Sequence, residues 1–99
     1  MKARTFSPAW GRGVILATST TTGNTLVGKG NNVVIVSNQD ATDGMYIACG
    51  NSSVTATTAD YYLQAGASVL VTKNRDDDYV AAIAVANTPS LHIMPGEGI

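Results

Sequence analysis

The chain offers few side chains that could do nucleophilic or acid–base chemistry. It contains one histidine, His92, and one cysteine, Cys49. A serine- or cysteine-type hydrolase needs a nucleophile, a histidine base and an orienting group within reach of one another, and no such spacing is present. We expect His92 to point outward from a strand or into an interface, and Cys49 to fill the core as a small hydrophobic residue. The sequence therefore predicts no catalytic residue and a protein that is not an enzyme.

The densest group of charges is Asp76, Asp77 and Asp78. Clustered carboxylates suit Ca²⁺ or Mg²⁺, but the stretch lacks the spaced acidic ligands and distant Glu of an EF-hand loop. A solvated hairpin tip is the preferred interpretation, with a cation or a basic patch on a neighbour as the alternatives. The segment 28–30 (GKG) lacks the rest of a phosphate-binding loop and predicts only a turn. A single cysteine cannot build a thiolate zinc site, and we expect neither metal nor cofactor.

The first twelve residues differ from the rest of the chain. Basic and aromatic side chains interleave there: Lys2, Arg4, Phe6, Trp10 and Arg12. Such a segment could contact nucleic acid by phosphate binding and stacking, or be a disordered terminus. Trp and Arg are also favoured anchors of protein interfaces, so we expect an extended N-terminal arm over 1–12 that docks on another subunit. The predicted docking residues are Arg4, Phe6, Trp10 and Arg12.

Length and composition narrow the class of protein. Ninety-nine residues suit a single domain, and the 13% of charged residues is about half the usual share. The net charge of -1 argues against a nucleic-acid coat, and no apolar run is long enough to span a membrane. No apolar stretch follows the basic start as in a signal peptide, so we expect a chain used without export. Few surface charges favour a surface covered by partners.

Short β-branched runs separated by Gly, Asn and Asp predict strands rather than helices. The expected strands are 14–18 (with 20–22 as an extension), 25–27, 33–36, 45–49, 68–73, 79–86 and 91–94. The expected turns and loops are 22–24, 28–32, 37–44, 64–67, 74–78 and 87–89. We expect a bend or short helical turn at 59–63.

About seven strands at this spacing predict a sandwich or barrel, and no strand–helix–strand spacing suggests a parallel sheet. The expected fold is an all-β, antiparallel sandwich or barrel, formed by one domain over 13–99 behind the N-terminal arm. The predicted core comprises Val14, Leu16, Val34, Val36, Ile47, Cys49, Val69, Val71, Ile83, Val85, Leu91 and Ile93.

Five short segments follow one another in a characteristic order from residue 30 onward: 30–38 (GNNVVIVSN), 45–50 (MYIACG), 65–68 (AGAS), 79–84 (YVAAIA) and 93–98 (IMPGEG). In this order they resemble a family of small structural proteins of tailed-bacteriophage virions. Proteins of this kind look like head decoration or cement proteins. The resemblance implies a compact β-sandwich, often jelly-roll-like, that clamps neighbouring capsid subunits and carries no catalytic residues.

The predicted function is that of a non-enzymatic phage virion protein that binds the major capsid protein or other virion subunits and stabilises the head. We expect a homo-oligomer, dimer or trimer, located in the virion and binding neither nucleic acid nor membrane. The alternative is a tail, baseplate or host-recognition module that binds carbohydrate or a receptor through Tyr46, Tyr61, Tyr62 and Tyr79. A small cupin-like enzyme would need several histidines for its metal, and the chain has one.

Overall fold

The computed structural model describes residues 6–28 and 30–98, and these residues form strands, turns and loops without a helix. Arg4, a predicted docking residue, and Lys29, in a predicted turn, lie outside the described residues. The strands are β1 (Ser7–Pro8), β2 (Val14–Ala17), β3 (Gly23–Leu26), β4 (Val33–Asn38), β5 (Met45–Gly50), β6 (Tyr61–Leu63), β7 (Ser68–Thr72), β8 (Tyr79–Ala84) and β9 (Ser90–Glu97). In this part of the chain, no helix is long and apolar enough to cross a membrane.

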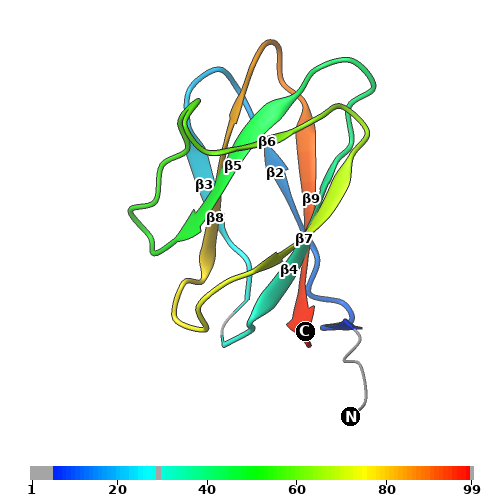
Figure 1. Cartoon of the computed structure of the whole chain (residues 1–99), viewed down its shortest axis with the longest axis vertical. Coiled ribbons are helices and arrows are strands. Elements are labelled where there is room, and N and C mark those ends of the chain that lie inside the picture. Colours follow the sequence, from blue (N-terminus) through cyan, green and yellow to red (C-terminus); the bar gives the residue numbers. More distant parts are fainter. Residues whose placement is uncertain (1–5, 29, 99) are drawn as a thin grey trace.

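The strands form two sheets (Figure 1). Sheet A has the order β1-β9-β4-β7, with β2 also pairing with β9, and sheet B has the order β3-β8-β5-β6. Every pair is antiparallel, which confirms the predicted all-β, antiparallel fold, and a sandwich is consistent with it. Most pairings join strands far apart in the sequence, and successive strands from β2 to β5 alternate between the sheets. The finer expectation of a jelly roll stays a prediction.

The core lies between the two sheets. Side chains alternate along each strand, so every second residue points inward. Val34 and Val36 of β4, with Leu91 and Ile93 of β9, belong to the buried cluster from sheet A. Sheet B contributes Met45, Ile47, Leu63, Val80 and Ala82 to the same cluster. Of the predicted core residues, Val34, Val36, Ile47, Leu91 and Ile93 are buried, and Val14, Leu16, Cys49, Val69 and Val71 pack partly buried against them.

The predicted inward face of β8 was wrong. Val80 and Ala82 face the core, whereas Ile83 is only half-buried and Val85 is 57% exposed beyond the strand. Both faces of this strand are apolar, so its sequence does not fix which face turns inward. The pairing with β5 determines the orientation of β8. Ile47, which belongs to the core, lies opposite Ala82, and Tyr46 lies opposite Ile83 on the outer face.

Several boundaries also differ from the expectations. The expected bend is present only at 59–60, where the amide of Asp60 donates to the carbonyl of Thr57 at 3.0 Å. Residues 61–63 form strand β6, because they pair with β5. In the predicted turn 22–24, Gly23 and Asn24 already belong to β3, and the chain bends at 20–21 instead. Just before this bend, Thr18 donates from both its amide and its hydroxyl to the carbonyl of Pro89. The segment 74–78 is no hairpin tip, since β7 and β8 belong to different sheets. The last strand continues to Glu97, beyond the predicted end at 94.

Candidate functional site: an edge bulge and an open sheet face

The described part of the predicted arm, residues 6–12, lies along an edge of sheet A in its own domain. Pro8 of β1 pairs with Gly96 of β9, and Val14 of β2 pairs with Ile93 of the same strand. Residues 9–13 thus lie opposite only Met94 and Pro95, which makes a bulge in the edge. Pro95 has no amide hydrogen, so at this position β9 cannot donate a hydrogen bond to the edge of the sheet.

A tight turn inside the bulge presents Trp10. The amide of Arg12 donates to the carbonyl of Ala9 at 3.0 Å, and Gly11 takes the left-handed conformation with φ of 79°. Trp10 stands at the tip of this turn and is 81% exposed. With Arg12 and Ala9, and with Gly28 and Asn31 of the β3–β4 connection, it lines a hollow of about 310 Å³. The structure therefore brings together two predicted docking residues, Trp10 and Arg12, and docking itself stays a prediction.

Phe6 occupies a different place from the other two described docking residues. A side chain at Gly96 would lie within 2.5 Å of the Phe6 ring and 2.4 Å of the carbonyl oxygen of Ser7. Phe6 is half-buried there, and Val33, which pairs with Gly96, is fully buried. Phe6 therefore helps to cover β9 of its own domain.

We expect Gly96→Ala to displace β1 from the sheet, because the new methyl group would overlap a backbone oxygen that cannot swing aside as a side chain can. Faster hydrogen exchange of the Ala9 amide, which donates to Pro95, would report the loss. Gly23→Ala is the matched control, since a Cβ there meets nothing within 4 Å. Unchanged protection of Ala9 in Gly96→Ala would contradict this packing.

The outer face of sheet A carries apolar side chains with no covering layer among the described residues. Ile35 of β4 lies between Met94 of β9 and Leu70 of β7, so the three form a row across the sheet. Ile15 of β2 lies opposite His92 in the next row. Ile15 is 69% exposed and Leu70 is 37% exposed. We call these five residues the outer stripe. An exposed apolar surface of this kind is typical of a contact site for another macromolecule.

The single histidine belongs to this stripe. His92 is half-buried on the outer face, which agrees with the expectation that it points outward from the last strand. A Cβ at Gly13 would lie 3.1 Å from its Nε2 atom and 3.2 Å from Cε of Met94. Gly13 therefore leaves room for both side chains at the bulged edge, next to Ile15.

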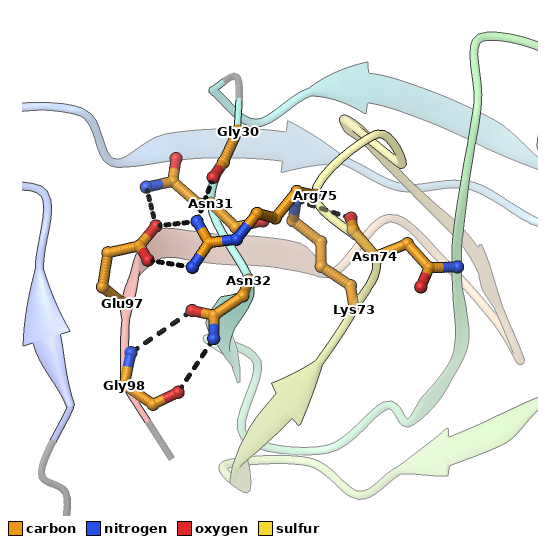
Figure 2. A network of polar contacts seen from close by, with 8 residues as sticks. All are labelled: Gly30, Asn31, Asn32, Lys73, Asn74, Arg75, Glu97 and Gly98. Atoms are coloured by element: carbon orange, nitrogen blue, oxygen red, sulfur yellow. Dashed lines mark hydrogen bonds and ion pairs between the residues drawn. The ribbon is translucent and has the colours of Figure 1, made fainter.

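A polar network fixes the end of the sandwich beside the bulge (Figure 2). Arg75 pairs with Glu97 at 2.7 Å and donates to the carbonyl of Gly30 at 2.6 Å. Asn32 and Gly98 exchange two hydrogen bonds, of 3.0 and 3.2 Å. Lys73 donates from Nζ to the carbonyl of Asn31 at 2.6 Å. These bonds hold the β3–β4 and β7–β8 connections against the end of β9.

The ion pair should be visible in the titration of Glu97. The hydrogen bond from Arg75, helped by its charge, lowers the pKa of the Glu97 carboxyl below its ordinary value of 4.5. The stability linked to this shift is present above that value and is lost as the pH falls through the lowered pKa. We expect an NMR titration to give Glu97 a midpoint below 4.5 that rises in Arg75→Ala.

Asp40 supplies an internal control in the same titration. Backbone hydrogen bonds from Asp43 and Thr42 lower the pKa of its carboxyl, and none of the causes involves Arg75. Its midpoint should therefore not move in Arg75→Ala. A Glu97 midpoint that is equally insensitive to the substitution would contradict the ion pair.

Side chains of the acidic run take part in local hydrogen bonds, and the cysteine is half-buried. Asp78 accepts from the amide of Gly30 at 3.4 Å, and Asp77 accepts from Asn74 at 3.2 Å. Within 6–28 and 30–98, no group of three or more His, Cys, Asp or Glu side chains is placed to hold a metal ion. Burial raises the pKa of the Cys49 thiol, which keeps it protonated at neutral pH and weakens it as a nucleophile.

The four tyrosines suggested for carbohydrate binding do not form one platform. Tyr46 and Tyr62 lie opposite each other on β5 and β6, with ring centroids 5.1 Å apart and planes tilted by 55°. Tyr61 is the neighbour of Tyr62 along β6 and alternates to the other face, although it is exposed at the edge. Tyr79 pairs with Gly50 at the other end of β5.

Sequence reasoning missed most of the outer stripe. Ile15, Ile35, Leu70 and Met94 belong neither to the predicted core nor to the predicted docking residues, because residue type alone does not assign an apolar strand residue to a contact surface. Alternation offered a signal: once Val14 and Leu16 are placed inside, Ile15 must point outward. The same argument applies to Leu70 between Val69 and Val71.

Comparison with known proteins adds to the description of the fold. No protein-family model matches the chain, and no curated protein matches it. Two chains of solved structures match. One comes from the work described as "Bacillus endospore appendages form a novel family of disulfide-linked pili". The match has a TM-score of 0.52 and 14% sequence identity, and it covers 98% of this chain and 91% of that one. At this identity the likeness concerns the fold alone.

Proposed function

We propose that this chain is a non-enzymatic structural subunit that works by binding other subunits of a protein assembly. The observation that carries the proposal is the outer stripe, where Ile15 and Leu70 remain exposed on the same face of sheet A. A free monomer gains nothing from keeping such side chains in water, whereas burial against a partner returns about 25 cal/mol for each Å² of apolar surface. The exposed Trp10 at the bulge would add an anchor beside this face.

The specific assembly that we propose is a tailed-phage virion, in which the chain binds the major capsid protein and stabilises the head. The sequence resemblance over 30–99 supports this choice, as does the sparse charge, which suits a surface covered by neighbours. The strand order, β2-β9-β4-β7 in one sheet and β3-β8-β5-β6 in the other, supports a jelly-roll fold for this role.

The pilus protein with a similar fold supports an assembly role for this chain, but we do not propose disulfide linkage between its copies. The words that describe it speak of disulfide-linked pili. An extended row of subunits joined by disulfides needs at least two cysteines in each subunit, and these 99 residues contain only Cys49. That thiol is half-buried, with a raised pKa. We therefore propose non-covalent contacts between subunits.

A second candidate is a tail, baseplate or host-recognition module that binds carbohydrate. The observation in its favour is the exposure of Tyr61 and Tyr62 at the edge of sheet B. Binding of the isolated chain to a glycan array, lost in Tyr62→Ala, would favour this candidate over the capsid role.

The test uses particles of a tailed phage that encodes the chain, stripped of it and then incubated with purified variants. We expect Ile15→Glu to abolish rebinding to the heads, since a carboxylate in the stripe would be desolvated against the partner. Val85→Glu is the matched control, because Val85 is also β-branched and 57% exposed but lies just beyond a strand of sheet B. Equal rebinding of both variants would overturn the docking face, and absence of the chain from purified particles would overturn the virion role.

A further inference from the structure

The open edge of sheet A is a surface that the proposed function does not yet use. Among the described residues, β7 (Ser68–Thr72) is the last strand of the sheet and pairs only with β4. With five residues it is longer than the other edge strands, β1, β2, β3 and β6. Its sequence, SVLVT, contains no charge, proline or glycine. Proteins that avoid edge-to-edge pairing place such residues on their edge strands, and this edge has none.

The hydrogen-bond pattern shows which backbone groups of this edge are not bonded to β4. The amide of Lys73 donates to Asn32, and the amide of Asn38 donates to Ala67. In an antiparallel ladder, bonded pairs alternate with unbonded pairs. The bonded residues of β7 are therefore Val69 and Val71, and the main-chain groups of Ser68, Leu70 and Thr72 point away from β4. All three residues are exposed.

The free edge is complementary to itself. If two copies of β7 pair in antiparallel orientation around a twofold axis at Leu70, Leu70 lies opposite its own copy. Ser68 then lies opposite Thr72 of the second copy, and Thr72 opposite Ser68. Cross-strand Ser–Thr pairs and apolar pairs both stabilise antiparallel strands. The main-chain groups of these three residues in each copy would form about six new hydrogen bonds.

The electrostatics and the outer stripe also favour this pairing. No residue from Ser68 to Thr72 is charged, so the two identical edges do not repel each other. The nearest cation, Lys73, is held by the carbonyl of Asn31 at 2.6 Å. The row formed by Met94, Ile35 and Leu70 ends at this edge. Pairing at Leu70 would join the rows of two copies into one continuous apolar band.

We propose that two copies of this chain pair through β7, which extends sheet A across a twofold axis and doubles the apolar face offered to the assembly. The occupant of the edge is thus a second copy of the chain, in an isologous contact. The inference rests on the proposed role as an assembly subunit, because it specifies how that face is presented.

The test measures the mass of the full chain in solution and the cross-linking of single cysteines in a Cys49→Ala background. We expect a dimer, and we expect Leu70→Cys to form a disulfide-linked dimer because residue 70 faces its own copy. Ser68→Cys is the matched control. It lies opposite Thr72, and its own copy is four residues away along the strand, beyond the ~7 Å limit for a disulfide. A monomeric wild type, or equal cross-linking of the two variants, would overturn the pairing.

Charged substitutions at exposed positions of β7 test the pairing independently and leave the core unchanged. We expect Ser68→Lys/Thr72→Lys to lose the dimer, since lysines then face lysines, and we expect mixing with Ser68→Glu/Thr72→Glu to restore it. Ile15→Lys/Ala17→Lys, on the opposite edge of sheet A, should remain dimeric. A dimer that persists in Ser68→Lys/Thr72→Lys would overturn the proposal. If the wild-type chain is monomeric in solution and phage heads still take it up, the pairing through β7 is refuted while the virion role stands.

Discussion

Replacing Ile93 by alanine is expected to lower the free energy of unfolding by about 2–5 kcal/mol, the range for losing a large aliphatic side chain from a close-packed core. Ile93 is fully buried on β9, opposite Val14 on one side and Val36 on the other. Small domains have about 5–15 kcal/mol of stability in total, so the loss is a large fraction of it. In a domain of this size, each kcal/mol corresponds to about 4–8 °C in Tm.

Val85→Ala is the control for this prediction, and it also tests the corrected orientation of β8. The side chain of Val85 is 57% exposed, so its truncation should change stability by no more than about 0.5 kcal/mol. Urea or thermal unfolding of both variants against wild type supplies the comparison. A large loss in Val85→Ala, or a near-normal Tm in Ile93→Ala, would mean that the inward and outward faces were interchanged.

Replacing Asn38 by alanine is expected to cost about 2–4 kcal/mol, because a buried amide leaves several partners unsatisfied when it is removed. Asn38 is 2% exposed at the end of β4. Its Nδ2 atom donates to the carbonyls of Asp43 at 2.9 Å and Leu63 at 3.3 Å. Its Oδ1 atom accepts from the amide of Asp40 at 3.0 Å. The side chain thus joins a strand of sheet A to β6 of sheet B and to the loop between β4 and β5.

Asn24 offers a closely matched control for Asn38. It also donates to two backbone carbonyls, those of Ser52 at 3.0 Å and Val54 at 3.2 Å, but it is exposed. Water can replace its hydrogen bonds, so Asn24→Ala should cost less than about 1 kcal/mol. Chemical unfolding of the two variants measures the difference. Equal losses of unfolding free energy in the two variants would show that burial does not determine how much Asn38 contributes to stability.

The strand class could be predicted because short β-branched runs are separated by turn residues. Part of the core could be predicted from alternation: Ile47 follows Met45 at the second position, and Leu91 and Ile93 flank His92. The run 33–36 (VVIV) is apolar on both faces, so alternation alone does not determine that Val34 and Val36 turn inward. The orientation of β8 could not be predicted in this way, because alanine, valine and isoleucine occur on both of its faces. The long-range register with β5 decided it, and no local pattern encodes that register.

The candidate surface was predictable only in part. Trp10 and Arg12 stand out by residue type, and they do lie together at the bulge. The bulge itself depends on how residues 9–13 meet Pro95, some eighty residues later, which spacing alone cannot reveal. Phe6 has the same residue class as Trp10, yet it packs against Gly96 of its own domain. Residue type therefore indicated candidate contact residues. The pairing of distant strands determined which of them are exposed, as Trp10 is, and which pack against their own domain, as Phe6 does.

We propose that this chain meets its partners through the outer face of sheet A. Cryo-electron microscopy of intact particles that contain the chain would show the density next to each face. We expect protein density against Ile15 and Leu70, with Trp10 at the edge of the contact. A chain held in the particle through other surfaces, with the outer face of sheet A open to solvent, would contradict it.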